Sequence, residues 1–571
     1  MFALTIAALG AQLPIGHLAY AQLGAGQVAP PSSPIERVLP QTQPQAQPRL
    51  LQQPTPGPAG PEGGPPVTIH SVEITGATEY TEAELAGSYS GIVGQTVPQD
   101  RVASVVRDIQ TKYRNDGYFL TVVRGAIEPE EAGPVLRVHV IEGFISDVKL
   151  EGDIGPAGVL VYRFLEKLTH IRPANISDVE RALLLVQGIP GVSARAVLRP
   201  GPGEVGAVEL VAQVGRKPFA GLVNYDNRGS TFAGTGELLV TADANSFTSL
   251  GERTELTVFD TPWNDEQVYS QLSTEAFIGS DGLKVKGYYG QGLSEPGSFL
   301  AATGFKSHLV LAGVSASYPI IRTRPLSLTS NLAFDASRSI IDEFGADNIR
   351  DPQSVTNLRI LRAGGNVLFQ DDTFGLGQIG ANSFTGTIHK GIVGLGSSRN
   401  NSPLPARVGN VIDFLKYTTE LTRVQNLFEY NDFLFALKLS MAGQYTDDVL
   451  PPNEKFFLGG TQYGRGFFSG EITGDRAIGG TVEFQASTTI DGLLTSNLQY
   501  YLFYDTGQTW DLAPGDQSHH LQSVGLGLRV DLTPSLTGEL ELTKRYTLNP
   551  SGTNTTPERP YAAFIRLVGR F

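Results

Sequence analysis

Apolar and polar residues alternate along most of the chain from about Arg216 to the C-terminus, in short segments separated by turns rich in Gly, Asn, Asp and Ser. A two-residue period places successive side chains on opposite faces of a β-strand. One segment carries an apolar face made of Val310, Ala312, Val314, Ala316 and Tyr318. Glycine and serine form its other face. The pattern predicts a long series of strands, each with one apolar face.

Two architectures fit strands of this kind. A membrane barrel turns the apolar faces to lipid and the polar faces to a wet lumen, whereas a soluble β-sandwich turns the apolar faces to a core. The last segment, YAAFIRLVGRF, favours the barrel, because it alternates and ends the chain on the aromatic residue Phe571. At roughly 20–24 residues for a strand with its loop, residues 216–571 hold about 16 strands, an even number as such barrels have.

A repeated unit with the order β-α-α-β-β precedes this region. The first copy has a strand at 67–76, helices at 80–91 and 98–118, and strands at 119–127 and 135–143. The second has a strand at 145–153, helices at 157–170 and 176–191, and strands at 193–201 and 208–215. Two helices show capping-box spacing, at Thr81 with Glu84 and at Ser177 with Glu180. A tandem repeat of one α/β unit predicts two small similar domains.

The N-terminal residues have a different character. Residues 1–21 are apolar and end in Ala-Tyr-Ala, which predicts a secretory signal peptide cleaved after Ala21. Residues 22–66 are rich in Pro and Gln and predict an extended linker. Within that linker, only Pro30–Gln41 could form a short helix. After the N-terminus no apolar run is long enough for a transmembrane helix.

Composition narrows the functional classes. The formal net charge is −14 and no long basic run occurs, which argues against nucleic acid as a partner. The chain has no cysteine, so disulfides and thiolate nucleophiles are excluded. The sequence shows no zinc-protease, nucleophile-elbow or P-loop motif. His519 and His520 lie in a polar segment and are interpreted as a solvated loop. We therefore expect no catalytic, cofactor or metal site, and no enzyme.

Five segments, in order, resemble the outer-membrane transporters of two-partner secretion, the hemolysin-activator or TpsB family. These segments are LRVHVIEGFISDVKLEGD, GIPGV with LRPGPGEVGAVEL, SYPIIRTRPLSLTSNLAFD, FFLGGTQYGRGFFSGEITGD and FYDTG. The resemblance covers residues 67–571. It implies a mainly β protein, with a transmembrane antiparallel barrel of about 16 strands at 216–571 after POTRA domains at 67–144 and 145–215.

The resemblance also implies a function and partners. Family members sit in the bacterial outer membrane with their POTRA domains in the periplasm. They recognise a large partner protein, typically β-helical, and export it to the cell surface without nucleotide (type V secretion). The implied contacts are the cognate partner, outer-membrane lipid and the barrel-assembly machinery, which reads a terminal signal at Phe571. A plug helix lies in the lumen of family members, and Pro30–Gln41 is the candidate for one here.

The site residues follow from two of the five segments. In the family a lid loop, here around 455–475, folds into the lumen, and its arginine contacts the aspartate of an F-x-D-x-G strand. The matching lid residues are Gly464, Arg465, Gly466 and Phe467, and the matching wall residues are Phe503, Asp505 and Gly507. Arg465 is thus expected to pair with Asp505, because a guanidinium presents a planar fork to a carboxylate. Gly464 replaces the usual valine, from which we expect a looser loop.

Three alternatives remain open at this point. The first is a barrel-assembly factor of the same superfamily, which typically carries a longer POTRA array. The second is a passive outer-membrane channel, which would lack the tandem domains and the lid arginine. The third is a soluble β-sandwich that binds a partner. Retention in the membrane on carbonate extraction would exclude the soluble module.

Overall fold

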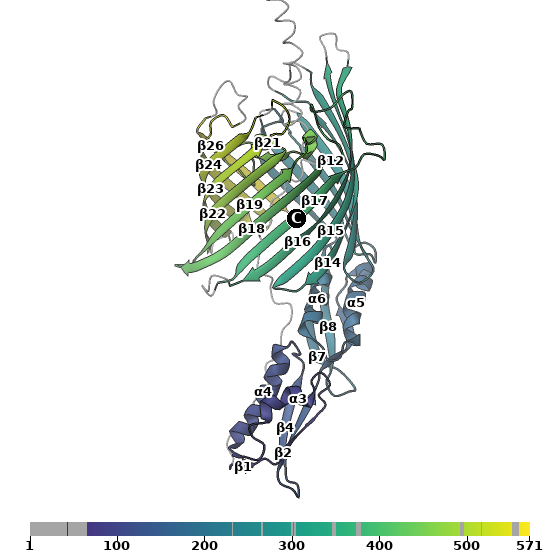
Figure 1. The fold of residues 1–571 in the computed structure, drawn as a ribbon, viewed down its shortest axis with the longest axis vertical. Coiled ribbons are helices and arrows are strands. Elements are labelled where there is room, and N and C mark those ends of the chain that lie inside the picture. The colour runs from purple at the N-terminus through teal and green to yellow at the C-terminus, as the bar shows by residue number, and fades with distance from the viewer. Residues whose placement is uncertain are drawn as a thin grey trace, which may run out of the picture.

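The computed structural model describes residue 43 and residues 65–571, with gaps at 231, 264–265, 298–300, 302–303, 345–349, 373–377, 491–495, 516 and 551–558. The expected signal peptide (1–21) and the candidate plug helix (Pro30–Gln41) lie outside the described residues, as does nearly all of the linker (22–66). A large barrel carries two small α/β domains, which follow one another below one side of it (Figure 1).

The first α/β domain has the predicted strands and helices in order, with an additional short strand, β3, between the two helices. They are β1 (Val67–Thr68), β2 (Ser71–Thr75), α3 (Glu82–Tyr89), β3 (Thr96–Val97), α4 (Gln99–Asn115), β4 (Val122–Glu128) and β5 (Val135–Ile141). Strands β2, β5 and β4 form a sheet in that order, and α4 buries Val102, Val105, Ile109 and Tyr113. These residues recur every three to four positions, the period of one face of a helix. The capping box at Thr81 and Glu84 is present.

The first predicted strand, 67–76, is divided in the structure. Its start, β1, pairs with β3, whereas β2 pairs in parallel with β5. Between them the backbone N–H of Ile69 donates to Gln95 and that of His70 to Pro134. The chain thus changes partners within one extended segment, which an alternating sequence pattern does not reveal.

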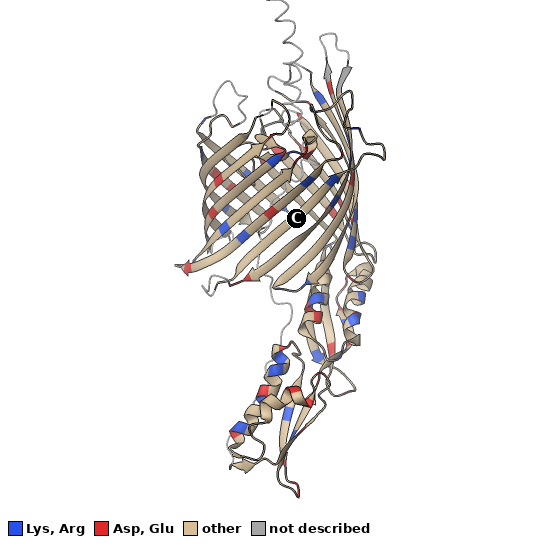
Figure 2. Cartoon of the chain, in the orientation of Figure 1, with Lys and Arg blue, Asp and Glu red and all other residues tan. Residues whose placement is uncertain are grey.

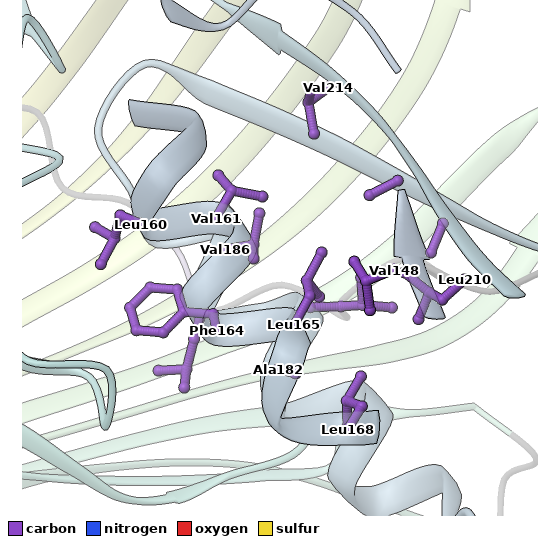
Figure 3. Packing of buried hydrophobic residues seen from close by; sticks show 14 of the residues in the cluster. Val148, Leu160, Val161, Phe164, Leu165, Leu168, Ala182, Val186, Leu210 and Val214 are labelled. Atoms are coloured by element: carbon purple, nitrogen blue, oxygen red, sulfur yellow. The ribbon is translucent and has the colours of Figure 1, made fainter. Parts of the chain in front are cut away.

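The second α/β domain repeats the first. Its elements are β6 (Phe144–Glu151), η1 (Gly155–Ala157), α5 (Gly158–Glu166), η2 (Lys167–His170), α6 (Ile176–Gln187), β7 (Val192–Pro200) and β8 (Ala207–Arg216). The sheet order is β6-β8-β7. Helices α5 and α6 contribute Val161, Phe164, Leu165 and Val186 to a buried apolar cluster that also contains Leu210 of the sheet (Figure 3). This apolar contact holds the domain together.

The second predicted capping box is wrong. Helix α6 begins at Ile176, and its N-cap is Asn175, whose side-chain oxygen accepts from the backbone N–H of Ser177 at 3.0 Å. Asparagine is among the most favourable N-cap residues, so it replaces the expected serine. Glu180 therefore has no capping role and reaches Arg324 of the barrel instead, at 3.7 Å.

Hydrogen bonds join the two α/β domains at the start of α6. The Asn175 side chain donates to the carbonyl of Asp116 at 3.0 Å, and the Ile176 N–H donates to the carbonyl of Gly117 at 2.9 Å. The Ala174 N–H donates to the carbonyl of Gly143 at 2.9 Å. The cap of a helix in the second domain is thus also a contact with the first.

Sixteen antiparallel strands form the closed barrel, which confirms the predicted fold class. They are β9 (Phe219–Asp226), β10 (Glu237–Asn245), β11 (Arg253–Asp260), β12 (Gln267–Ile278), β13 (Leu283–Ser294), β14 (Lys306–Arg322), β15 (Leu326–Phe344), β16 (Arg350–Asp371), β17 (Gly380–Gly391), β18 (Leu415–Tyr430), β19 (Phe433–Thr446), β22 (Arg476–Ile490), β23 (Ser496–Trp510), β24 (His519–Thr533), β25 (Leu536–Arg545) and β26 (Tyr561–Arg570). Each pairs with its neighbours, and β26 closes on β9.

The two faces of the barrel wall differ in polarity. Val314, Leu332 and Leu526 are about half exposed, whereas Asp335 and Ser339 are buried. Charged positions are scattered along the barrel strands and closely spaced on the helices of the α/β domains (Figure 2). An apolar outer face with a polar interior is typical of a barrel in lipid. Among the described residues, no helix is long and apolar enough to cross a membrane.

Phe571 lies at the point where the barrel closes. Its backbone N–H donates to the carbonyl of Gly221 and its carbonyl accepts from the Gly221 N–H, at 3.1 and 3.0 Å. A Cβ at Gly221 would lie 2.3 Å from the Phe571 ring, so the glycine leaves room for it.

Deleting Phe571 is expected to reduce barrel assembly more than barrel stability. The ring is 60% exposed, so its burial stabilises the fold by no more than about 2 kcal/mol. The checks are the surface level of the variant and its unfolding midpoint after purification. Normal surface levels would contradict an assembly signal, and Phe571→Tyr, which keeps the ring, is the control.

Candidate functional site

The lid loop, residues 455–475, lies between β19 and β22. It follows the short helix η4 (Pro452–Glu454) and begins and ends in a two-stranded hairpin of β20 (Phe456–Leu458) and β21 (Ile472–Gly474). At its tip the Gly459 N–H donates to the carbonyl of Tyr463, at 2.8 Å. These bonds make the loop a compact structure of its own, and its strand β21 is labelled in Figure 1.

Arg465 at the tip of the lid contacts Asp505 on β23. Its Nε lies 3.0 Å from Asp505 Oδ2 and its Nη2 lies 2.9 Å from Oδ1, which is the two-point fork expected for these groups. The backbone N–H of Arg465 also donates to Oδ2, at 2.7 Å. Only 4% of Arg465 and none of Asp505 is exposed. Each charge is therefore removed from water and compensated by the other.

Arg465 has further partners that the sequence did not reveal. Its Nη1 forms an ion pair with Glu483, which is fully buried on β22, and its Nη2 donates to Thr481 Oγ1 at 2.7 Å. The other oxygen of Glu483 accepts from Arg529, at 2.9 Å. The sequence signal was a glutamate between Val482 and Phe484, which an alternating strand places on the inner face.

The F-x-D-x-G segment acts as one unit because its spacing of two puts all three side-chain positions on the lumen face. The guanidinium of Arg465 stacks 3.7 Å above the centre of the Phe503 ring, and Asp505 accepts its hydrogen bonds. A Cβ at Gly507 would lie 2.6 Å from Leu458 of the lid. The strand thus supplies the Phe503 ring and the Asp505 carboxylate as contacts for Arg465, and Gly507 leaves space for Leu458 of the lid.

Gly464 and Gly466 allow the lid to approach the wall. Gly464 has φ +88°, and a Cβ there would lie 2.7 Å from Leu521. A β-branched valine is strained in that conformation. The glycine therefore fits a close contact with the wall, and the looser loop expected from it stays a prediction. A Cβ at Gly466 would lie 2.5 Å from Ser523, whose Oγ accepts from the Gly466 N–H at 3.2 Å.

Phe467 is fully buried within the lid. It belongs to an apolar cluster with Ala442, Leu458, Tyr463, Ile472 and Leu521. The cluster joins the lid to the wall strands β19 and β24 and so places an apolar contact beside the ion pairs. All seven lid and wall residues that the sequence singled out lie at this contact.

The lid also contacts Arg228, which lies where the barrel closes. Arg228, just after β9, donates to the carbonyl of Arg465 at 2.5 Å and forms an ion pair with Glu541 of β25. The Arg228 guanidinium lies over the Phe564 ring of β26, at 4.1 Å. No pattern in the sequence connected Arg228 with the lid. Among the described residues, no group of three His, Cys, Asp or Glu residues could hold a metal ion.

Comparison with known proteins gives matches to both parts of the chain. The Omp85 superfamily domain matches residues 393–543, and the ShlB-type POTRA domain matches residues 67–143. The heme/hemopexin transporter protein HuxB of Haemophilus influenzae (strain 86-028NP) is 24% identical over 470 residues, 79% of this chain and 78% of HuxB. The outer membrane transporter CdiB of Escherichia coli is 29% identical over 189 residues, 32% of this chain and 31% of CdiB.

Solved structures show the same fold. CdiB from Escherichia coli superposes with a TM-score of 0.71 at 18% identity, covering 90% of this chain and 93% of that one. CdiB from Acinetobacter baumannii gives 0.61 at 15% identity, covering 91% and 94%. The chain belongs to the two-partner secretion transporters of the Omp85 superfamily. This transporter lies in the outer membrane, with its POTRA domains in the periplasm.

The base of the transporter's lid has a second set of buried ion pairs. Asp475, at the end of the lid, accepts from Arg407 at 2.6 Å and from the backbone N–H groups of Leu450 and Leu512 at 2.9 and 2.8 Å. Arg407 belongs to the loop between β17 and β18 and also pairs with Asp511, at 3.0 Å. The lid is thus held at its tip by Arg465 and at its base by Asp475.

Asp475→Asn is expected to loosen the base of the lid and leave the barrel folded. It removes one charge of a buried pair, which costs roughly 3–5 kcal/mol, and replaces an acceptor oxygen by a donor. We expect more frequent channel openings in planar bilayers and faster proteolysis within 455–475. The control is Asp447→Asn, because Asp447 pairs with Arg476 while 76% of its side chain is exposed. If Asp475→Asn and Asp447→Asn gave the same channel conductance, this would contradict the view that the base of the lid holds the pore closed.

Proposed function

We propose that this protein recognises one large secreted partner in the periplasm and exports it through the barrel to the cell surface. The observation that carries the proposal is the arginine of a lid loop, buried against the inner wall of a 16-stranded barrel that carries two POTRA domains. The relatives HuxB and CdiB are named as transporters. In this proposal the chain performs no catalysis and needs no cofactor.

The proposed division of labour follows the order of the chain. Residues 67–144 and 145–215 receive the partner, and residues 216–571 conduct it. The first POTRA sheet ends at β4 and the second at β7, so both offer an edge to an extended chain. Addition of a strand to such an edge uses backbone hydrogen bonds and tolerates many sequences. A β-helical partner, whose chain is rich in strands, suits this mode of capture.

The lid loop is proposed to close the resting pore. Its tip is held by ion pairs and hydrogen bonds from Arg465 to Asp505, Glu483 and Thr481, all of them buried. Passage of a chain then requires these contacts to be broken and the lid to move. Because the sequence has no nucleotide-binding motif, we propose that folding of the partner outside the cell drives export.

Reconstitution tests this function against barrel assembly. The purified protein is placed in vesicles, and the unfolded product of a neighbouring reading frame that encodes a long β-helical protein is added. We expect this chain to cross the membrane and become protected from protease, while an unrelated unfolded barrel is not inserted. Insertion of unrelated barrels, without transfer of the candidate partner, would assign the protein to the assembly factors instead. Folding of purified 216–571 in the same vesicles controls for their quality.

A further inference from the structure

The segment SYPIIRTRPL was singled out in the sequence, and the lid and its wall partners do not account for it. The structure places Pro319–Arg322 at the end of strand β14. The pairing with β15 shifts between Pro319 and Ile321, so Ile320 is an extra residue in the ladder. Proline lacks the N–H that a ladder needs, and a bulge is one of the few places where a strand accepts it.

The bulge presents two backbone carbonyls to the second POTRA domain. Arg181 of α6 donates from Nη2 to the carbonyl of Pro319 at 3.1 Å and from Nη1 to that of Ile320 at 3.4 Å. Beyond the bulge, Arg324 lies 3.7 Å from Glu180, the residue next to Arg181. Two adjacent residues of α6 therefore contact the bulge in β14 and the turn that follows it.

An apolar contact lies beside these polar ones. A Cβ at Gly282, in the β12–β13 turn, would lie 2.6 Å from Leu185 of α6 and 2.9 Å from Pro319. Gly282 also has φ +93°, a conformation that suits glycine. The glycine thus lets α6 and the bulge approach each other across a neighbouring turn.

The β12–β13 turn makes further contacts with the same domain, and one more barrel turn also contacts it. Lys167 donates to the carbonyl of Ser280 at 2.8 Å and pairs with Asp281 at 2.5 Å, and Phe164 meets Phe277 edge to face at 5.5 Å. In the β10–β11 turn, Ser246 Oγ donates to the carbonyl of Pro190, at 2.6 Å.

These turns lie on one side of the barrel, where Figure 1 shows α5 and α6 beneath β14. Domains joined by a single linker usually move relative to each other, but contacts of this number and kind oppose such motion.

We propose that Pro319–Arg324 is a permanent docking clasp for the second POTRA domain, with Arg181 as the positioning residue. The POTRA arm then stays fixed below one side of the pore while the partner passes. Because Asn175 ties the second POTRA domain to the first, the clasp also sets where the first domain lies. Cargo is therefore presented to the lumen from one direction.

Cross-linking provides the decisive test. The chain has no cysteine, so an introduced pair of cysteines supplies the only thiols in this chain. Glu180→Cys with Arg324→Cys is treated with a short bis-maleimide in outer membranes. We expect efficient cross-linking without the partner present and unchanged export afterwards. Failure to cross-link would mean that the domain is not docked, and loss of export after cross-linking would mean that it must undock. The cross-link itself does not depend on the proposed function, whereas the export measurement does.

Arg181→Ala tests the positioning residue separately. Hydrogen bonds from a charged donor contribute enough that their loss shifts the docked-to-undocked ratio about tenfold or more. Spin labels on Val205→Cys and Tyr430→Cys, both exposed, should show a narrow distance distribution that broadens in Arg181→Ala. Arg181→Lys should restore it in part, and Arg163→Ala, on the exposed face of α5, should leave it unchanged. An unchanged distribution in Arg181→Ala would overturn this role.

Discussion

Replacing Arg465 by alanine is expected to abolish most partner export, because the lid then lacks the contacts that position it before it moves, while the barrel still inserts into the outer membrane. The change leaves Asp505 buried without its cation, and breaking such a pair costs roughly 3–5 kcal/mol. It also removes the guanidinium from the Phe503 ring and from Glu483. The strand pairing of the wall does not involve this side chain, so closure of the barrel should be kept. Export is measured as partner in the medium, normalised to barrel in the membrane.

Variants of the pair distinguish an interaction from two separate effects. Arg465→Lys should restore export only in part, because lysine lacks the planar fork that reaches both Asp505 oxygens. Arg465→Ala with Asp505→Ala should be less harmful than the two single effects added, by about 0.5–3 kcal/mol, since neither charge is left alone. Glu483 keeps Arg529 as a partner in the double variant. Strictly additive defects would show that the pair does not act as a unit.

Two further variants complete the series. Charge reversal, Arg465→Asp with Asp505→Arg, should recover little, because the backbone N–H of residue 465 and the carboxylate of Glu483 stay where they are. Arg476→Ala is the control. It removes an arginine beside the lid, and the ion-pair partner of that arginine, Asp447, is largely exposed. An export defect in Arg476→Ala as large as that in Arg465→Ala would mean that any change near the lid suffices.

Deleting residues 67–215 is expected to reduce export below detection and leave a folded, heat-modifiable barrel. All 16 barrel strands lie after the deletion, and the closure of β26 on β9 is retained. The first strand begins at Phe219, three residues beyond the end of β8 at Arg216. The loss should therefore fall on the capture of the partner. Comparison of shifts in electrophoretic mobility on heating, with and without the deletion, reports barrel folding.

Two outcomes of this deletion are informative. Equal export by the truncated barrel would remove the receptor role from the POTRA domains. A barrel that no longer shifts on heating would show that the second POTRA domain is needed for folding of the turns it contacts. Arg181→Ala serves as the milder comparison, because it keeps both domains and loosens only their attachment.

Local patterns were sufficient to predict most elements of the fold. The apolar face of α4 and the alternating strands of the barrel follow from periods of 3.6 and 2 residues, which depend on neighbours in the sequence. The number of barrel strands followed from length. Arg465 and Asp505 were paired through a resemblance between motifs, and the structure brings them to 2.9 Å. Their part in export stays a prediction.

Other features depended on register and on closure of the barrel, and no local pattern contains them. Arg228 and Glu541 are 313 residues apart and meet only because β26 pairs with β9. The N-cap of α6 is Asn175, whose side chain also donates to Asp116 of the first domain, and the local sequence does not show that contact. The sequence shows Pro319 but not its contact with Arg181. The bulge at Pro319 meets Arg181 because the fold brings the end of β14 next to α6. The sequence thus determined the strands, the helices and the identity of the central pair. The tertiary structure decided which distant groups share one buried site. A buried charge without an opposite charge is costly, and its partner is a residue that only the closed barrel brings close to it.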